Sequence, residues 1–62
     1  MFYKVTMSQG DYEQAQFAYQ AHACLFALEL SKLNKDVIYE VRYITLTNDF
    51  ITAYENGKES GQ

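Results

Sequence analysis

Two residues of this sequence, His22 and Cys24, have side chains that could act together as a base and a nucleophile. A thiolate beside an imidazole is an activated nucleophile, because the imidazole accepts the thiol proton. The spacing argues against this chemistry, since the segment around both residues is predicted to be helical and positions two apart on a helix point away from each other. We therefore expect that the chain is not an enzyme.

Metal and cofactor sites are not expected either. His22 and Cys24 are the only residues of their types, whereas a catalytic zinc site needs three protein ligands and a structural site needs four. The three glycines do not form a glycine-rich turn that leads into a helix with a lysine, so no phosphate-binding loop is predicted. We assign no catalytic residue, metal ligand or cofactor-binding residue.

The length and composition indicate one small folded domain. The chain has 62 residues, of which 48% are hydrophobic, and it contains no proline. A domain of this size buries only about 60% of the surface that its unfolded chain exposes. Because a single cysteine cannot form a disulfide within the chain, we expect stabilisation by a second copy or by a larger protein.

The charge balance excludes several partners. The formal net charge is −3, from eight acidic and five basic residues. The sequence therefore lacks the excess of basic residues that is typical of nucleic-acid-binding proteins. The longest strongly apolar stretch, Ala21 to Leu28, is shorter than the roughly 20 residues of a membrane span. Because the first residues do not resemble a signal peptide, we expect a cytoplasmic protein without membrane contact.

The apolar pattern predicts a strand followed by a long helix. Residues 2–7 are rich in β-formers and alternate between two faces. Residues 12–33 contain no glycine or proline and are dominated by good helix formers, and Asp11 is suited to be the N-cap. Asn34 is suited to end the helix in a left-handed conformation.

Residues 37–47 form the clearest predicted strand. One side of it carries Val37, Tyr39, Val41 and Tyr43, and the other carries Ile38, Glu40 and Arg42. Because the tyrosines share their side with valines, we expect them to pack in the core rather than to stack on nucleic-acid bases. After Tyr43 the apolar phase changes, so either a bulge restores it or both faces are covered there.

The chain beyond this strand has two interpretations. Residues 47–49 have turn chemistry and residues 50–54 have strand propensity, which favours a hairpin. The alternative is a short helix that begins at Thr47 and stops at Gly57. Residues 56–62 contain no apolar anchor, so the domain is predicted to span residues 1–55 and the remainder to be a flexible tail.

The expected fold class is α+β. The connection between the first two strands is long enough for a right-handed crossover, which would make those strands parallel and the third antiparallel. This predicts a single small β-α-β-β layer, with one long helix packed on a three-stranded sheet. The first two strands need not be neighbours in that sheet.

The predicted helix carries two apolar stripes. The first, expected to face the sheet, consists of Tyr12, Ala15, Tyr19, His22, Ala23, Phe26, Leu30 and Leu33. The second lies on the opposite side and consists of Phe17, Ala21, Cys24 and Leu28. A surface helix in a monomer needs one apolar face, so we expect another copy to cover the second stripe in an antiparallel two-fold arrangement. The alternatives are plain exposure of these residues, or cover by the C-terminal segment.

A second candidate interface lies on the strand at 37–47, where Glu40 and Arg42 are flanked by Ile38 and Ile44. Together these features predict a small non-enzymatic protein-interaction module that works as a homodimer or on a larger protein. Such acidic domains are frequent among accessory proteins of phages and mobile elements, which bind and inhibit or modulate a host protein. The alternatives are a dimeric nucleic-acid-binding transcriptional regulator that uses Lys4 and Arg42, and a small enzyme with a site assembled between two chains.

Overall fold

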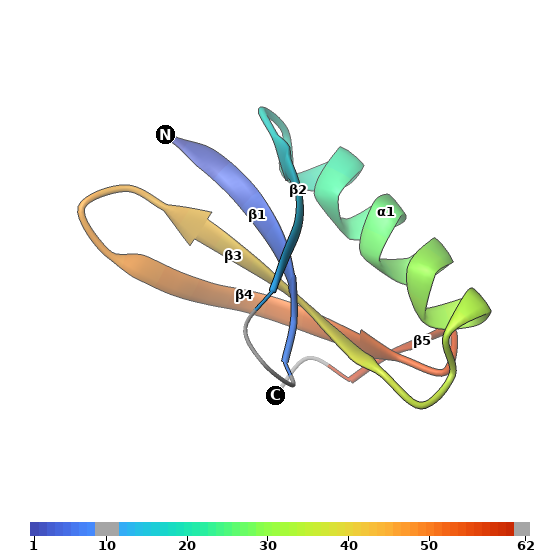
Figure 1. The fold of residues 1–62 in the computed structure, drawn as a ribbon. Helices are drawn as coiled ribbons and strands as arrows, with labels where there is room; N and C mark the ends of the chain where they lie inside the picture. Colours follow the sequence, from blue (N-terminus) through green and yellow to red (C-terminus); the bar gives the residue numbers. More distant parts are fainter. Residues whose placement is uncertain (9–11, 61–62) are drawn as a thin grey trace.

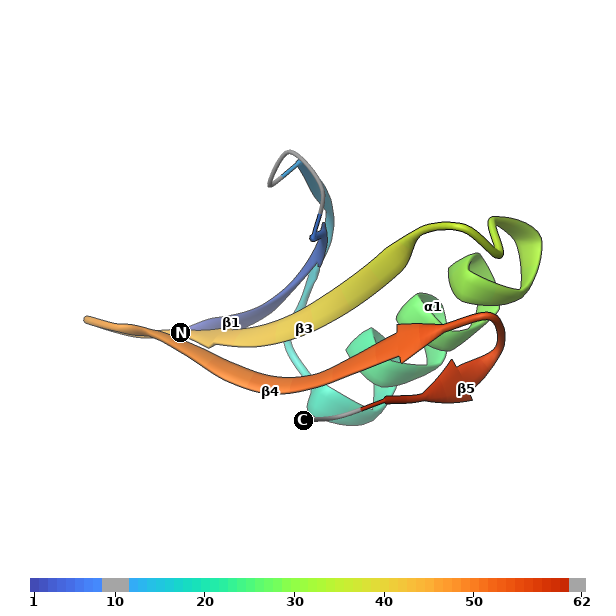
Figure 2. The same ribbon diagram turned by 90° about the horizontal axis from the view of Figure 1, so that it is seen from below.

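The computed structural model describes residues 1–8 and 12–60 of the chain. In chain order the elements are β1 (Phe2–Met7), β2 (Glu13–Phe17), α1 (Gln20–Leu33), β3 (Ile38–Ile44), β4 (Asn48–Glu55) and β5 (Lys58–Glu59). The strands form one sheet in the order β2-β1-β3-β4-β5, and every neighbouring pair is antiparallel. The helix lies on one side of this sheet (Figures 1 and 2).

The α+β class is confirmed, but the three-stranded β-α-β-β layer is wrong. The sheet has five strands, and β1 pairs with β3 in the antiparallel direction instead of the parallel one. The cause is the additional strand β2, which pairs with β1 and reverses the chain before the helix begins. Because the chain reverses its direction once more than predicted between β1 and β3, these two strands are antiparallel.

Strand β2 occupies a segment that the sequence predicts to be helical. Its residues Ala15 and Phe17 pair with Val5 and Tyr3 of β1, and both are partly buried. This pairing gives the backbone of residues 13–17 the hydrogen bonds that a helix would otherwise supply, so tertiary contacts override the helical preference of these residues. Asp11, the expected N-cap, lies outside the described residues.

The helix is 14 residues long and about 21 Å from end to end. It begins at Gln20, and Tyr19 takes the N-cap position without a side-chain capping hydrogen bond. It ends at Leu33, as the sequence predicts. Asn34 is not left-handed, since its φ is −127°, but its backbone N–H donates to the carbonyl of Leu30 at 2.9 Å. In the described chain, no helix is long and apolar enough to cross a membrane.

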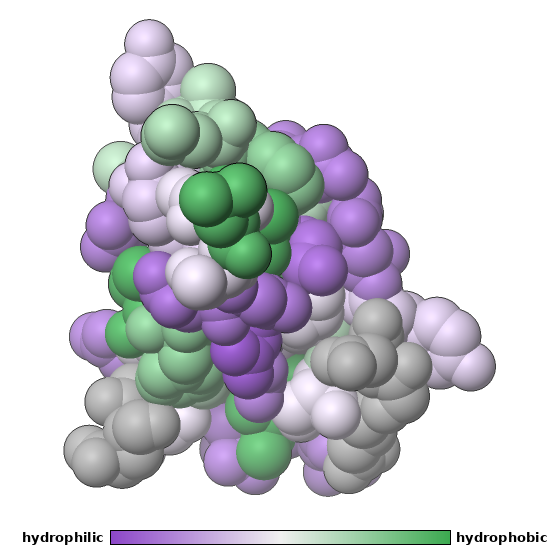
Figure 3. All heavy atoms as spheres, turned by 90° about the vertical axis from the view of Figure 1, so that its left-hand side faces the viewer, coloured by the Kyte–Doolittle hydropathy of each residue, from purple (hydrophilic) through white to green (hydrophobic). Residues whose placement is uncertain are grey.

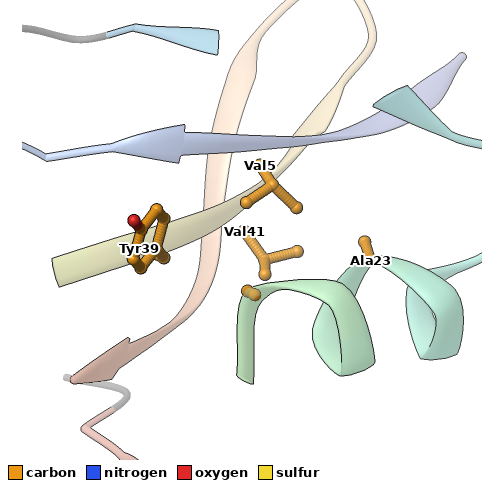
Figure 4. Packing of buried hydrophobic residues seen from close by; sticks show 5 residues of the cluster. Val5, Ala23, Tyr39 and Val41 are labelled. Carbon is orange, nitrogen blue, oxygen red and sulfur yellow. The ribbon is translucent and has the colours of Figure 1, made fainter. Parts of the chain in front are cut away.

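The core lies between α1 and the central strands β1 and β3. It consists of Val5, Ala23, Ala27, Tyr39 and Val41, all buried (Figure 4). The two alanines allow the helix to approach the sheet closely, because their side chains add little thickness between the layers. Tyr39 packs in the core, as expected, whereas Tyr43 is only half-buried and stacks on Tyr3, with 4.7 Å between the ring centres.

The first predicted stripe is only partly the buried face of the helix. Ala23 is buried, and Phe26 and Leu30 pack against the core. His22 and Leu33 are exposed, and so is Tyr19. The buried helix positions are Ala23, Ala27 and Ser31, spaced four residues apart. The buried face of the helix is therefore rotated relative to the predicted stripe, because that stripe was derived with residues 12–19 included and the helix does not contain them.

The C-terminal part forms the predicted hairpin and not the alternative short helix. Strand β4 pairs with β3, and a bulge places Ile51 as an extra residue between Thr52, opposite Val41, and Phe50, opposite Arg42. The predicted change of phase after Tyr43 coincides with the end of β3 at Ile44.

The predicted flexible tail is corrected for residues 56–60. Asn56 and Gly57 both have positive φ and connect β4 to β5 in a two-residue turn. The N–H of Ser60 donates to the carbonyl of Ala53 at 2.8 Å, which extends the pairing. The folded unit therefore includes β5, and residues 61–62 lie outside the described part.

Candidate interaction surface

The side of the sheet that faces away from α1 is the candidate surface, and we call it the open face. Side chains alternate along a strand, and residues paired across strands share a face. From the pairing of β1, β3 and β4, the open face consists of Phe2, Lys4, Thr6, Ile38, Glu40, Arg42, Ile44, Asn48, Phe50, Ala53 and Glu55. In the described chain no helix other than α1 is present, and it contacts the opposite side of the sheet.

An ion pair lies at the centre of the open face. Arg42 donates from Nη2 and Nε to Oε1 of Glu40, at 2.8 Å and 3.1 Å. The side chains of Arg42 and Glu40 are only 27% and 20% exposed, because residues on β1 and β4 flank them. A partly shielded, doubly hydrogen-bonded pair holds both side chains in place more firmly than a fully exposed pair would.

An aromatic side chain lies beside this ion pair. The guanidinium carbon of Arg42 is 5.4 Å from the centre of the Phe50 ring, a cation–π distance. Arg42 Nη1 also approaches the carbonyl of Asn48, at 3.4 Å. Phe50 remains 37% exposed. The open face therefore combines a fixed cation with an accessible aromatic ring.

On the other side of the ion pair the surface is closed and apolar. Glu40 pairs with Thr6 on β1 and with Ala53 on β4, and both of these residues are buried. The Oγ1 atom of Thr6 has no hydrogen-bond partner among the described residues.

The end of the molecule at the β3–β4 turn is also apolar. Figure 3 views this end and shows strongly hydrophobic atoms next to polar ones. Leu46 in the turn is fully exposed, and Met1 is nearly so.

The four secondary interface candidates, Ile38, Glu40, Arg42 and Ile44, lie together on the open face as a single row along β3. Sequence reasoning missed Phe50, because the alternation in β4 does not reveal the bulge at Ile51. It also did not place Lys4 beside Arg42, although the same alternation would have shown this once β1 and β3 were paired.

The structure does not bring Phe17, Ala21, Cys24 and Leu28 into one uncovered helix face. Phe17 lies on β2, where its ring is 5.2 Å from that of Phe26, and Cys24 packs against the core. Ala21 is exposed and Leu28 is half-buried. The most exposed large apolar residues of the helix are instead Leu33 at its end, at 79% exposure, and Leu25, at 59%.

His22 and Cys24 lie in different surroundings. The exposed imidazole of His22 contacts the ring of Tyr19 edge-on, with 5.5 Å between ring centres. The half-buried Cys24 lies beside Tyr54. Burial, followed by the hydrogen bond to Cys24 and the nearby charges of Cys24 and Glu59, raises the pKa of Tyr54 to about 12. Within the described residues there is no group of three metal-ligating side chains and no pocket.

Comparisons with family models, with curated proteins and with solved structures found no match to this chain.

Proposed function

We propose that this chain is a non-enzymatic protein-interaction module that works as a dimer, binds stoichiometrically and inhibits or modulates another protein. Its binding surface is the open face. The observation that supports this proposal is the arrangement around Arg42, where an ion pair, a cation–π contact and an accessible Phe50 ring lie on a sheet face that no described helix covers.

This combination of side chains is typical of protein interfaces. Aromatic residues and arginine are enriched at the energetically important centre of such interfaces, where neighbouring residues exclude water. Arg42 lies on the central strand β3 of the open face, Phe50 lies beside it on β4, and Ile44 and Phe2 pair at the next level along the strands. Arg42 is already positioned by Glu40, so a partner would not have to order this side chain on binding.

The charges favour a protein over a nucleic acid as the partner. A nucleic-acid surface needs several unpaired cations to contact phosphates. On the open face Arg42 is paired with Glu40, which leaves Lys4 as the remaining basic residue. This balance of charge suits a mixed protein surface.

Site-specific photocrosslinking tests the proposal. The photoreactive residue p-benzoylphenylalanine replaces Phe50 on the open face in one variant and Tyr19 at the start of the helix in a matched control, since both positions hold exposed aromatic rings. Irradiation in the native cell should give a discrete protein adduct from position 50 and none of the same mass from position 19.

Two outcomes would contradict the proposal. An adduct formed only from position 19 would assign binding to the helix side. An adduct that nuclease treatment removes would favour the nucleic-acid regulator. As a check on catalysis, Cys24→Ser and His22→Gln, made separately, should leave the position 50 adduct unchanged.

A further inference from the structure

The side chains of β3 on the open face have a symmetric chemical order. Along the strand they are Ile38, Glu40, Arg42 and Ile44. When this strand is laid antiparallel over a copy of itself, each acid faces a base and each isoleucine faces an isoleucine. A two-fold axis through the level of Val41 produces this match, because that level lies midway between Glu40 and Arg42.

The neighbouring strands follow the same symmetry. At the level of Arg42 lies a basic row, which consists of Gln16, Lys4, Arg42 and Phe50. At the level of Glu40 lies an acidic row, which consists of Glu13, Thr6, Glu40 and Ala53. The two-fold axis places the basic row of one copy on the acidic row of the other. Arg42 then faces Glu40, Lys4 faces Thr6, and the large Phe50 faces the small Ala53.

We propose that the open face binds a second copy of this chain through this two-fold axis, sheet against sheet, with Glu40 of each copy facing Arg42 of the other. The inference rests on the proposed function, since it names a second copy as one occupant of the same surface, and a different protein would have to displace this copy from the open face. Closed two-fold pairing is the commonest form of self-association, and it requires the surface to be complementary to itself.

Glu40 and Lys4 can each form a further polar contact with a second chain. Oε1 of Glu40 accepts both hydrogen bonds from its own Arg42, while among the described residues Oε2 accepts none. Lys4 forms no ion pair within the described part of the chain. In the dimer these atoms complete a network of four or more charges, and the ion pair within each chain does not need to break.

The size of the surface sets the expected affinity. Neighbouring strands are about 4.8 Å apart, and successive residues on the same face of a strand are about 6.7 Å apart. With these spacings the projected area of the open face is on the order of 400 Å². Stable interfaces bury roughly 800 Å² on each partner. We therefore expect a reversible dimer with a dissociation constant in the micromolar range. The strands of two packed sheets cross at roughly 30°. This rotation displaces the ends of the strands more than their centre, so the test addresses the central contacts between Glu40 and Arg42.

Charge reversal at these two positions tests the proposal, with mass measured by sedimentation equilibrium across the micromolar range. Glu40→Arg places two arginines against each other, and Arg42→Glu does the same with two glutamates. Each variant alone should lose dimerisation by at least about tenfold, since like charges in an interface are strongly unfavourable. An equimolar mixture should recover a 1:1 heterodimer, because the two arginines at positions 40 and 42 of one chain then face the two glutamates at these positions of the other.

Controls separate this interface from loss of folding and from the helix side. The double variant Glu40→Arg/Arg42→Glu restores opposite charges within and between chains and should dimerise again. Glu29→Lys and Lys32→Glu alter an exposed ion pair on α1 and should leave the dimer intact. Circular dichroism checks that every variant is folded.

Three results would overturn the inference: a monomer at all concentrations, a dimer that tolerates both reversals, or two dissociated variants that do not recombine. Dissociation by Leu28→Asp with no effect of Glu40→Arg would assign the dimer to the helix side. If dimerisation fails these tests while the position 50 adduct with a different protein persists, the proposed function stands and only the second copy is excluded. If both fail, the open face has neither role.

Discussion

The hydroxyl of Ser31 accepts a hydrogen bond of 3.0 Å from the backbone N–H of Gly57. Ser31 is completely buried on the helix, and Gly57 is in the turn between β4 and β5. The same hydroxyl donates to the carbonyl of Leu28 at 2.7 Å. This contact joins the end of the helix to the last hairpin and explains why a serine occupies the buried face of α1.

Ser31→Ala removes the acceptor and leaves the Gly57 N–H buried without a partner. We expect a loss of about 1–2 kcal/mol in the free energy of unfolding, measured by chemical denaturation, together with faster hydrogen exchange at Gly57. Ser60→Ala is the control, since that side chain is exposed and should cost little. Unchanged protection of the Gly57 amide in Ser31→Ala would show that this hydrogen bond contributes nothing.

Gly57→Ala should destabilise the same turn from the other side. Gly57 has a φ of +75°, and an added Cβ would approach Cγ of Lys32 to 3.0 Å. Lys32 is flexible and exposed, so the backbone conformation is the main cause of an expected loss of about 1 kcal/mol. Thermal unfolding should show a lower midpoint. If Gly57→Ala/Lys32→Ala recovers the whole loss, the close approach to Lys32 is responsible instead.

The stability of the fold should depend on Tyr54 at high pH. Because burial raises the pKa of Tyr54 from 10.0 to about 12, the folded state retains this proton between those values, whereas the unfolded chain releases it. The contribution to stability is complete below pH 10 and is lost as the pH rises through 12. Denaturation curves should decline less steeply over this range in Tyr54→Phe than in the unmodified chain. Tyr12→Phe, at an exposed position, should retain the full decline; equal slopes for all three proteins would rule out the effect.

Ala27→Leu should disrupt the packing of α1 on the sheet. Ala27 is completely buried in the core cluster that also contains Val5 and Val41. Adding three carbon atoms here forces the layers apart, at a cost of about 1–3 kcal/mol. Chemical denaturation measures the loss. Leu25→Ala, on the outer side of the same helix, should change stability by less than about 0.5 kcal/mol, and an equal effect of both variants would mean that the core is misplaced.

The dipeptide Asn56-Gly57 is a strong local signal for β5 that the prediction of a flexible tail overlooked. It is the dipeptide that most favours a two-residue hairpin turn, because both residues tolerate positive φ. Both have that conformation here, and β5 follows. The tail was predicted because the segment lacks an apolar residue. The hydrogen bond to Ser31 and the pairing with β4 compensate for that lack, and neither contact is visible in the sequence.

The sequence by itself determined the two sides of β3 and the end of the helix. Alternation along a strand is a property of the local backbone, so Tyr39 and Val41 had to share one side, and Glu40 and Arg42 the other. The tertiary structure alone decided that residues 13–17 form a strand, because pairing with β1 satisfies the same backbone groups and outweighs the helical preference of these residues. It also decided that Phe50 and not Ile51 joins the open face, because the bulge in β4 turns Ile51 toward the core and depends on contacts between distant segments.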